Sequence, residues 1–518
     1  MGDGEAMSLD PMVSDSEAPR AARPAEGREL ELKLDIEPDD TDALLDHPLL
    51  RDSVGEPRKT HSIYYDTKKK ALQRAGVSLR VRRAGDRYVQ TVKANGKASA
   101  GLFDRSEWEE PIAGPAPDLD RVRALSTVLD QEAVRSGLQP VFETRIERRA
   151  CLLEWQGARI EVVIDRGSVV AGKRNQPVLE VELELIDGPP QALFALARAL
   201  QSAVPLRLGV LTKAERGARL SQRATSRAVK AEKLTLSPTM SVAEAFQAIA
   251  FACLRHFRSN EPLVMGARDV DALHQARVAL RRLRSALSLF KPVLAEAAAH
   301  RFRDELRDLS NKLGEARNLD VLLQRRSEAL GPEARRRLVD ERTRAYDAVM
   351  AALRTPQVRT MMLDLVEWIA LAEFIADDPS GRARAQAPLP DFATAVLRRF
   401  WKKVRRSGRQ FADLDDEARH ELRIAGKKLR YAAEFFAALY DKRAERRDQF
   451  ITQLQELQEE LGDLNDLATE RELEERLAAL AIHLPAPANS DGGKQKATLL
   501  ARSDAAYREL AGIGAFWR

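Results

Sequence analysis

The chain contains few cysteines and few aromatic residues, and these shortages exclude several classes of protein. Only Cys151 and Cys253 occur among its 518 residues, and aromatic residues make up 5%. Two distant cysteines support neither a disulfide framework nor a cysteine-type metal site, and a reducing cytosol suits such a composition. Sparse aromatics argue against nucleic acid as a partner, because proteins that bind single strands stack bases on aromatic rings.

Long apolar runs are also missing. The best candidate, from Val242 to Leu254, carries Glu244 and falls short of the roughly 18 apolar residues that a membrane-spanning helix needs. Residues 1–27 are acidic and then rich in Ala, Pro and Arg, without the apolar core of a signal peptide. We therefore expect a disordered tail over residues 1–27 and a cytoplasmic protein that is not inserted in a membrane.

Charge is abundant and nearly balanced. The chain has 84 basic and 79 acidic residues, and its formal net charge of +5 is small for its length. Function should therefore show in how the two signs are segregated along the chain. Sequence patterns divide the chain into a strand-rich part over residues 28–222, a polar and basic linker over 223–238, and a helical part over 239–518.

Charged and apolar residues alternate in the strand-rich part. Glu29, Glu31 and Lys33 would share one face of a strand, with leucines on the other face. Similar runs follow at 79–83, 89–93, 105–109, 142–147, 159–165 and 180–185. One charged strand face is usually only solvated, but six or more with mixed signs are harder to explain in that way. If the strands close into a barrel, the charged side chains would line its lumen. Carboxylates could hold a divalent cation there, and basic groups could bind phosphate.

These runs resemble the CYTH family, the triphosphate tunnel metalloenzymes. Glu29-Leu-Glu-Leu-Lys33 matches its ExExK signature, and the resemblance continues through Tyr64 to Thr67, Lys93, Asp165 and the Thr212-Lys-Ala-Glu-Arg-Gly217 motif. The resemblance implies an antiparallel barrel (α+β) around a tunnel that hydrolyses or cyclises triphosphates with a divalent cation, Mg²⁺ or Mn²⁺. Metal ligands on that analogy are Glu29, Glu31, Glu180, Glu182 and Glu184.

The same resemblance assigns the basic residues. Glu29, Glu31 and Lys33 would be catalytic, and the groups that would bind phosphoryl oxygens are Lys33, Arg80, Arg82, Lys93, Arg105, Arg145 and Lys213. This assignment makes physical sense because phosphoryl transfer needs mainly positioning and neutralisation of charge on the phosphate oxygens. Asp165 remains open between a metal-site role and a structural role at the turn near Gly167.

An internal repeat marks the helical part. The segment from His274 to Arg284 aligns without gaps on the segment from His420 to Arg430, at an offset of 146. Ser241 and Glu244 have the capping-box spacing at the start of the first helix, and breaks are expected near Gly266, at 377–390 and at 484–493. We expect an all-helical bundle of two related halves, about 239–375 and 391–518.

Basic residues recur along one stripe of each repeat. Positions 274, 277, 281 and 284 share a helix face, and a solvated surface is the usual explanation for one such stripe. Two copies with a histidine at the same point instead favour a polyanion as the partner. The helical part resembles the CHAD domain, which implies polyphosphate binding by His274, Arg277, Arg281, Arg282, Arg284, His420, Arg423, Lys427, Lys428 and Arg430.

The combined expectation is metal-dependent hydrolysis of inorganic triphosphate in the barrel, with polyphosphate binding by the helices. Association with polyphosphate granules is one role that the helical part could serve. A non-catalytic polyphosphate-binding protein is an alternative. An enzyme that acts on ATP or thiamine triphosphate, or that cyclises ATP, is another. The sequence predicts no oligomeric state.

Overall fold

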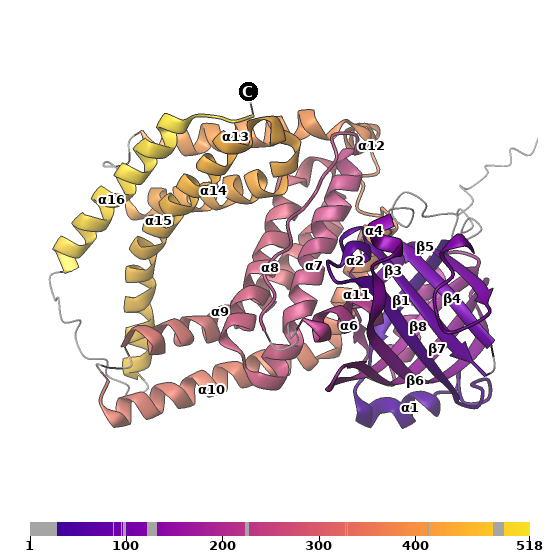
Figure 1. Cartoon of the computed structure of the whole chain (residues 1–518). Helices are drawn as coiled ribbons and strands as arrows, with labels where there is room; N and C mark the ends of the chain where they lie inside the picture. Colours follow the sequence, from indigo (N-terminus) through magenta and orange to yellow (C-terminus); the bar gives the residue numbers. More distant parts are fainter. Residues whose placement is uncertain are drawn as a thin grey trace, which may run out of the picture.

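The computed structural model describes the chain from residue 28 to residue 517, apart from residues 86, 95, 97–99, 122–131, 223–226, 327, 329, 410, 412–413 and 480–491. A β-barrel and an array of helices lie side by side, with α6, α7 and α11 at the junction (Figure 1). The antiparallel barrel and the helical domain expected from the sequence are both confirmed. The tail expected over residues 1–27 lies outside the described residues.

Eight strands form the closed barrel. They are β1 (Arg28–Asp35), β2 (Arg58–Thr67), β3 (Val77–Ala84), β4 (Arg87–Ala94), β5 (Leu102–Ile112), β6 (Leu138–Trp155), β7 (Ala158–Ala171) and β8 (Arg174–Asp187). Their order is β5-β4-β3-β2-β6-β7-β8-β1, and pairing of β1 with β5 closes the ring. The short strand β9 (Arg207–Leu208) pairs with the end of β1.

The alternation seen in the sequence separates the two surfaces of this barrel. On β7 and β8 the residues Ile160, Val162, Ile164, Val181 and Leu183 are buried in the apolar core outside the barrel wall, where α5 (Gln191–Gln201) packs. Their charged neighbours point to the lumen, since successive strand side chains face opposite sides. Helix α5 therefore covers the apolar face of the barrel wall.

Helix α6 (Lys213–Ser221) packs against β6, β7 and β8 at one end of the lumen. Thr212 caps it and forms a capping box with Glu215, which fixes where the helix starts. A Cβ atom at Gly217 would lie 2.1 Å from Cε2 of Phe142, so only glycine fits at this point. Leu220 and Phe142 belong to an apolar cluster that includes Ile146, and this cluster fills the end of the barrel beside α6.

The barrel half also contains short helices between its strands. They are η1 (Pro38–Asp40), α1 (Thr41–Leu45), α2 (Ala71–Arg74), η2 (Leu119–Arg121) and α4 (Glu132–Arg135). The carboxylate of Asp66 accepts backbone hydrogen bonds from Leu72 and Gln73, which fixes the start of α2.

The second half is helical. Its main helices are α7 (Val242–Ala267), α8 (Val270–Leu289), α9 (Glu296–Arg326), α10 (Pro332–Arg354), α11 (Pro356–Ala370), α12 (Pro379–Gln386), α13 (Leu389–Gly408), α14 (Asp416–Phe435), α15 (Ala444–Ala479) and α16 (Gly492–Ile513), with η4 (Lys291–Val293) and η6 (Ala437–Arg443) between them. The capping box of Ser241 and Glu244 is present. The break expected at 377–390 is partly wrong, because α12 forms inside it. The break expected at 484–493 falls mostly outside the described residues.

The repeat is visible as matching helices. α8 and α14 are both 20 residues long and their bounds differ by the same offset of 146, since 270 + 146 = 416 and 289 + 146 = 435. Asp269 and Asp415 cap them through the same bond to the third residue that follows. Equal lengths, equal caps and equal spacing indicate two copies of one helical unit.

Barrel and helices share one hydrophobic core. Leu183 on β8 and Phe194 on α5 belong to the same buried cluster as Phe246 on α7 and Leu365 on α11. Charged contacts line the junction: Arg198 of α5 bonds Asp364 at 2.8 Å and also pairs with Glu367, both on α11. The two halves are therefore packed as one body. None of the helices in the described part of the chain combines the length and apolarity that crossing a membrane requires.

Candidate functional site

The lumen of the barrel holds a charged cavity of about 330 Å³, which we call the tunnel. Seven carboxylates and seven cationic groups line it, so the two signs are balanced. The acids are Glu29, Glu31, Glu107, Glu109, Glu161, Glu182 and Glu184, and the bases are Lys33, Arg80, Arg82, Lys93, Arg105, Arg148 and Lys213.

Three acids and two lysines meet at the closed end of the tunnel. One oxygen from each of Asp165, Glu180 and Glu182 lies within 4.8 Å of the others, an arrangement that could hold a metal ion. Nζ of Lys213 lies 2.6 Å from Asp165 and 2.5 Å from Glu180. Lys33 donates to Glu180 at 2.9 Å and also pairs with Glu182. Burial by itself would lower the pKa of Lys33, but the carboxylates of Glu180, Glu182 and Glu31 hold it well above the usual value.

Unsatisfied oxygens in this cluster fit a divalent cation. Oε1 of Glu31 and Oε2 of Glu180 are buried and accept no hydrogen bond, although Lys33 Nζ lies 3.2 Å from the former. A buried carboxylate oxygen without a hydrogen bond is costly unless a cation occupies its free position. Oxygen ligands are those that Mg²⁺ prefers, so the chemistry of the donor set suits the ion expected from the sequence.

The other wall of the tunnel pairs acids with bases. Glu29 accepts from Lys93 at 2.8 Å and from Arg105 at 3.1 Å, and Arg105 also reaches Glu31 at 3.0 Å. Glu31 thus lies between the acidic cluster and the basic wall. Glu29 is bound on two sides by cations, so it lies apart from the three-acid cluster.

Glu184 is a tunnel acid whose pKa is raised. Burial and the neighbouring carboxylates of Glu29, Glu107 and Glu161 together raise its pKa to about 8, and Lys93 opposes this rise only in part. A carboxyl group in this environment is protonated at neutral pH until a cation binds beside it. Of the five acids predicted as metal ligands, Glu180 and Glu182 therefore lie in the three-acid cluster, and Glu29, Glu31 and Glu184 line the tunnel around it.

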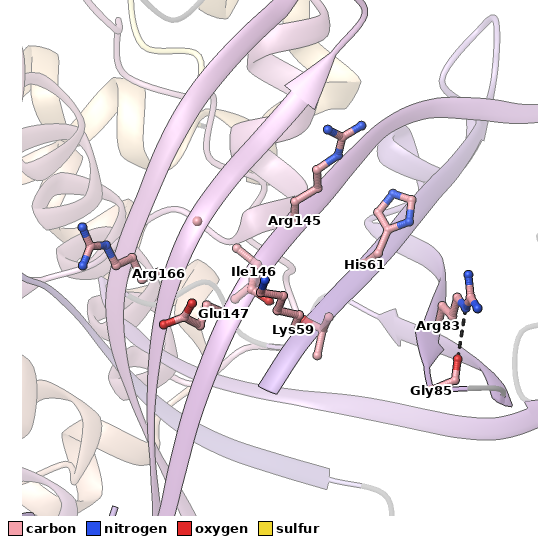
Figure 2. Close-up of a pocket in the computed structure, with 10 residues that line it drawn as sticks. Lys59, His61, Arg83, Gly85, Arg145, Ile146, Glu147 and Arg166 are labelled. Carbon is pink, nitrogen blue, oxygen red and sulfur yellow. Dashed lines mark hydrogen bonds between the residues drawn. The ribbon is translucent and has the colours of Figure 1, made fainter. Parts of the chain in front are cut away.

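The predicted placement of Arg145 in the tunnel is wrong. Its side chain is 66% exposed, pairs with Glu143 at 2.6 Å and faces the outer side of the barrel beside His61 (Figure 2). The sequence suggested that the charged set on β6 faced inward. The inward residues on this stretch are instead Phe142, Thr144 and Ile146, because this end of the lumen is filled by α6 and needs apolar groups.

Arg148 takes the place in the tunnel that was assigned to Arg145. It bonds Asp165 through two parallel contacts of 2.8 and 2.6 Å and reaches Glu182 at 3.2 Å. The sequence contained a signal for this placement, because Arg148 is two residues from Ile146 and four from Thr144 and so shares their face of the strand. Asp165, which the sequence left open, is fully buried in the three-acid cluster. The other six predicted phosphate-binding residues all line the tunnel.

A helix of the second half holds α6 in place. Arg255 on α7 pairs with Glu215 and donates to the carbonyl of Val210 at 2.5 Å. Glu215 also accepts from the backbone of Thr212 at 2.9 Å, immediately before Lys213. The position of the Lys213 ammonium in the tunnel is thus connected to the helical half by two successive contacts.

A second connection runs along the same junction. Arg258 on α7 lies 3.6 Å from Asp35 at the end of β1, and Arg216 donates to the other oxygen of Asp35 at 2.8 Å. Arg216 Nη2 also lies 3.8 Å from Glu180 in the three-acid cluster. All four groups are at least two thirds buried, so water screens these contacts little.

The basic stripes of the repeat converge in the helical half. α8 packs against α14. Lys427 is largely buried, and the positive charges of Arg423, Arg281, Arg277 and Arg430 add to that burial and lower its pKa to about 7. Arg281 and Arg277 belong to the other copy, so the two stripes face a common region. We call Arg277, Arg281, Arg423 and Lys427 the helical stripe.

His274 lies beside the helical stripe. Burial lowers its pKa, and the nearby guanidinium groups of Arg317, Arg281 and Arg277 lower it further. Its imidazole is therefore neutral at neutral pH and offers one N–H donor to an anion. His420, its counterpart in the second copy, is exposed at the corresponding point of α14.

Three predicted polyphosphate residues lie elsewhere. Arg282 donates to Glu434 at 2.7 Å and stacks over Phe435 with its side chain 12% exposed, so it contributes to packing here, and its predicted role in polyphosphate binding stays a prediction. Arg284 faces Arg307 and Arg303 on α9. Lys428 faces Arg303, Lys403 and Arg399 and lies 5.9 Å from the ring of Phe400. Residues on one helix face can have different neighbours in the folded protein, and the stripe seen in the sequence could not distinguish them.

Comparison with known families follows the same division. A family model for the CYTH domain matches residues 27–218, and one for the CHAD domain matches residues 248–475. The inorganic triphosphatase of Haemophilus influenzae is 33% identical over 193 residues, which cover 37% of this chain and 54% of that relative. The match thus spans about half of the relative. An uncharacterised protein of Mycobacterium tuberculosis is 28% identical over 87% of this chain and 89% of its own length.

Solved structures resemble each half separately. The CHAD domain from the plant Ricinus communis is 28% identical, with a TM-score of 0.46, and covers 56% of this chain and 98% of its own. A putative adenylyl cyclase from Hippeastrum, described as having a dominant triphosphatase activity, is 21% identical with a TM-score of 0.31 and covers 38% of this chain and 96% of its own. With both family models matched in order, the chain consists of a CYTH domain at residues 27–218 followed by a CHAD domain at residues 248–475.

Proposed function

We propose that the tunnel hydrolyses inorganic triphosphate with the help of a divalent cation, Mg²⁺ or Mn²⁺. The observation that carries this proposal is the buried three-acid cluster, in which Oε2 of Glu180 is unsatisfied and Glu182 also lines the small cavity with its seven cationic groups. When bound, the cation would neutralise phosphate charge and activate or orient water. Asp165, Glu180 and Glu182 would hold it, with Glu31 beside them.

The bases on the opposite wall would bind the phosphate chain. Arg105 and Arg148 present planar donors that suit two oxygens at once, and Lys93 adds a compact charge. Each of them is held by a carboxylate in the free protein, so a phosphate chain would exchange one set of oxygens for another. Such preorganised cations stabilise the charge that develops on the leaving phosphate.

An inorganic substrate fits the tunnel better than a nucleotide does. The cavity of about 330 Å³ lies at the lower end of ligand pockets and its lining is mostly charged. Tyr64 is the one aromatic residue among the described residues that line it, and its ring already stacks on Phe142 at 4.5 Å. A base or thiazole ring would therefore find no free aromatic face among the lining residues.

A panel of substrates and metals tests this proposal. Phosphate release from tripolyphosphate, ATP and thiamine triphosphate is measured with Mg²⁺, with Mn²⁺ and with a chelator. We expect kcat/KM for tripolyphosphate to exceed that for ATP at least tenfold and to vanish with the chelator. Equal turnover of the organic substrates would favour a different substrate class. No release with any tested metal and pH would favour the non-catalytic alternative.

For the helical half we propose polyphosphate binding at the helical stripe. Four cations from two repeats repel one another, and a polyanion would relieve that repulsion. The fourfold variant Arg277→Glu, Arg281→Glu, Arg423→Glu and Lys427→Glu, which we call the stripe variant, should weaken binding of long-chain polyphosphate at least a hundredfold. Binding by the native chain should also weaken as salt rises, as counterion release requires. Unchanged affinity in a stripe variant that melts normally would refute this assignment.

A further inference from the structure

A second group of basic residues lies on the outer wall of the barrel. Its side chains are Lys59, His61, Arg83, Arg145 and Arg166, which we call the outer basic surface. They line an open cavity of about 750 Å³ together with Glu147 and nearby backbone. Figure 2 shows their side chains along neighbouring strands. The surface is separate from the tunnel. Along each strand these side chains alternate with the inward-facing ones, such as Arg82 and Arg148, and therefore point to the opposite face of the barrel wall.

Strand register places these cations directly beside one another. His61 on β2 is paired with Arg83 on β3 and with Arg145 on β6. Lys59, two residues before His61, lies opposite Glu147 in the strand register, and Glu147 lies opposite Arg166 on β7. Neighbouring strands are only about 4.8 Å apart, and like charges directly opposite each other destabilise a sheet. A row of Arg83, His61 and Arg145 therefore needs a compensating partner.

The protein compensates these charges only in part. Glu143 accepts from His61 at 2.7 Å and pairs with Arg145 at 2.6 Å, so one carboxylate serves two cations. Arg83 donates its Nε to the carbonyl of Gly85 at 3.0 Å. Lys59 and Arg166 form no ion pair with any residue that the structure describes. Four permanent cations against the two carboxylates Glu143 and Glu147 leave a formal charge of 4 − 2 = +2 among the described residues.

Other parts of the barrel's outer wall are covered. On the same strands β6 and β7, the outward residues Cys151, Ile160 and Val162 are buried in the common core. At the outer basic surface the wall is exposed instead, with 66% of the Arg145 side chain accessible. A charged, exposed stretch beside these covered parts of the wall is a candidate interaction surface.

We propose that the outer basic surface binds a chain of inorganic phosphate. Arginine side chains from three strands offer planar donors to successive phosphate groups, and Lys59 adds a further charge. No Phe, Tyr or Trp is among the lining residues in the described part of the chain, so nucleic acid would find no stacking platform there. The site is distinct from both the tunnel and the helical stripe, and it does not depend on either being functional.

Chemical footprinting tests the site in the native full-length chain. Lysines are acetylated with and without long-chain polyphosphate at about 50 mM salt, and modification is read by mass spectrometry. We expect polyphosphate to protect Lys59 several-fold and to leave Lys173 unchanged, since Lys173 is an exposed lysine at the β7–β8 turn. Equal modification of Lys59 with and without polyphosphate would overturn the proposal.

Charge reversal provides a second test, made in the stripe variant so that the helical site does not contribute. Adding Lys59→Glu, Arg145→Glu and Arg166→Glu should weaken the remaining polyphosphate binding at least tenfold. The matched control is Arg51→Glu, Arg159→Glu and Lys173→Glu, which reverses three exposed cations elsewhere on the barrel half and changes the net charge equally. The control should change affinity less than twofold.

Other outcomes would count against the proposal. Equal weakening by both triple variants would mean that only net charge matters. Absence of any residual binding in the stripe variant at 50 mM salt would mean that the outer basic surface binds no phosphate chain. Tighter binding of single-stranded DNA than of polyphosphate of equal charge would assign the surface to nucleic acid. If the triple reversal does not fold, Arg145→Gln with Arg166→Gln replaces it, with an expected loss of at least threefold.

Discussion

At the scale of single residues, the buried oxygens of the tunnel are the most informative feature. Oε2 of Glu180 is fully buried, accepts no hydrogen bond and belongs to the three-acid cluster. Its charge is balanced in the free protein by the ammonium groups of Lys33 and Lys213. The tunnel therefore contains an acidic site whose charge two lysines balance in the absence of a bound cation.

Glu180→Gln tests this view of the cluster. Removing one charged ligand should lower kcat for tripolyphosphate by about 10²- to 10³-fold, the loss typical for a group that stabilises transition-state charge. It should also weaken Mn²⁺ binding at least tenfold in calorimetry, which requires no turnover. Glu154→Gln makes the same chemical change at an exposed residue of β6 and serves as the control. Equal metal affinity in both variants would remove Glu180 from the metal site.

Arg148→Ala tests which side chains of β6 face the tunnel. Arg148 faces the tunnel and bonds Asp165 twice, whereas the next residue, Arg149, has the opposite parity. We expect Arg148→Ala to lower kcat/KM for tripolyphosphate about a hundredfold, because a charge-assisted contact in a buried site is lost. Arg149→Ala should lower it less than about threefold by the same reasoning. Steady-state kinetics with thermal melts of both variants decide, and the reverse order would refute the assignment.

These residues show how far the sequence could define the site. The alternation of Glu29, Glu31 and Lys33 was sufficient to predict which face of β1 looks inward. On β6 the same reasoning placed Arg145 inward, because it assumed that every charged residue faces the lumen. The lumen is apolar beside α6 and charged beyond it, so the inward set changes character along one strand. That change depends on where a distant helix docks, which no local pattern contains.

At the scale of whole elements, the paired helices α8 and α14 are the clearest case of a prediction that the structure bears out. Their equal lengths and equal offset follow directly from the gapless repeat. The sequence could not tell that Arg282 turns away to Glu434 while Arg281 stays with the helical stripe. Adjacent positions on a helix differ by about 100°, so a small rotation decides between packing and exposure.

Lys427 gives the helical stripe a pH dependence. Its pKa is lowered to about 7 by burial and by four neighbouring arginines. The positive charge is therefore present below about pH 7 and lost above it, so polyphosphate binding by the native chain should weaken between pH 6 and pH 8. Arginine stays charged throughout this range. Lys427→Arg should thus flatten the pH dependence of the dissociation constant, and the difference between the two proteins removes the titration of polyphosphate itself.

A parallel pH dependence in both proteins would mean that Lys427 does not titrate in this range. Stability offers an independent check. The unfolded chain binds a proton at this lysine up to about pH 10.4, so between about pH 7 and 10 the unfolded state holds more protons. The free energy of unfolding of the native chain should therefore rise with pH over that window relative to Lys427→Arg.

At the scale of the whole molecule, the junction between the two domains carries the main surprise. The sequence indicated a linker over 223–238 and two parts that could be tested separately. In the structure His256 and Asn260 of α7 bond the backbone of Val229, so part of this segment is fixed against the helices. Long-range ion pairs such as Arg255 with Glu215 leave no local trace in a sequence, which is why the junction could not be predicted.

Arg255→Ala tests whether the helical half positions the tunnel residues. Loss of its contact with Glu215 should loosen the start of α6 and with it Lys213. We expect kcat/KM for tripolyphosphate to fall about tenfold, in line with the effect of misplacing a catalytic group. Arg255→Lys should recover part of the loss, because it restores the charge.

Arg268→Ala is the matched control, because it also removes one arginine ion pair, that with Asp347, at the residue that follows the end of α7. It should leave the pH profile and KM of the tunnel reaction as they are. Equal kinetic changes in the Arg255 and Arg268 variants would mean that the contact with Glu215 only stabilises the fold.

The shared core has a consequence for how such a chain can diversify. Leu183, Phe194, Phe246 and Leu365 come from both domains and are buried together. Exchange of either domain by recombination would bring an unmatched apolar surface and unmatched charges such as Arg198 against Asp364. The two domains should therefore be inherited together. Substitutions on one side of the contact between the domains should be accompanied by compensating substitutions on the other side.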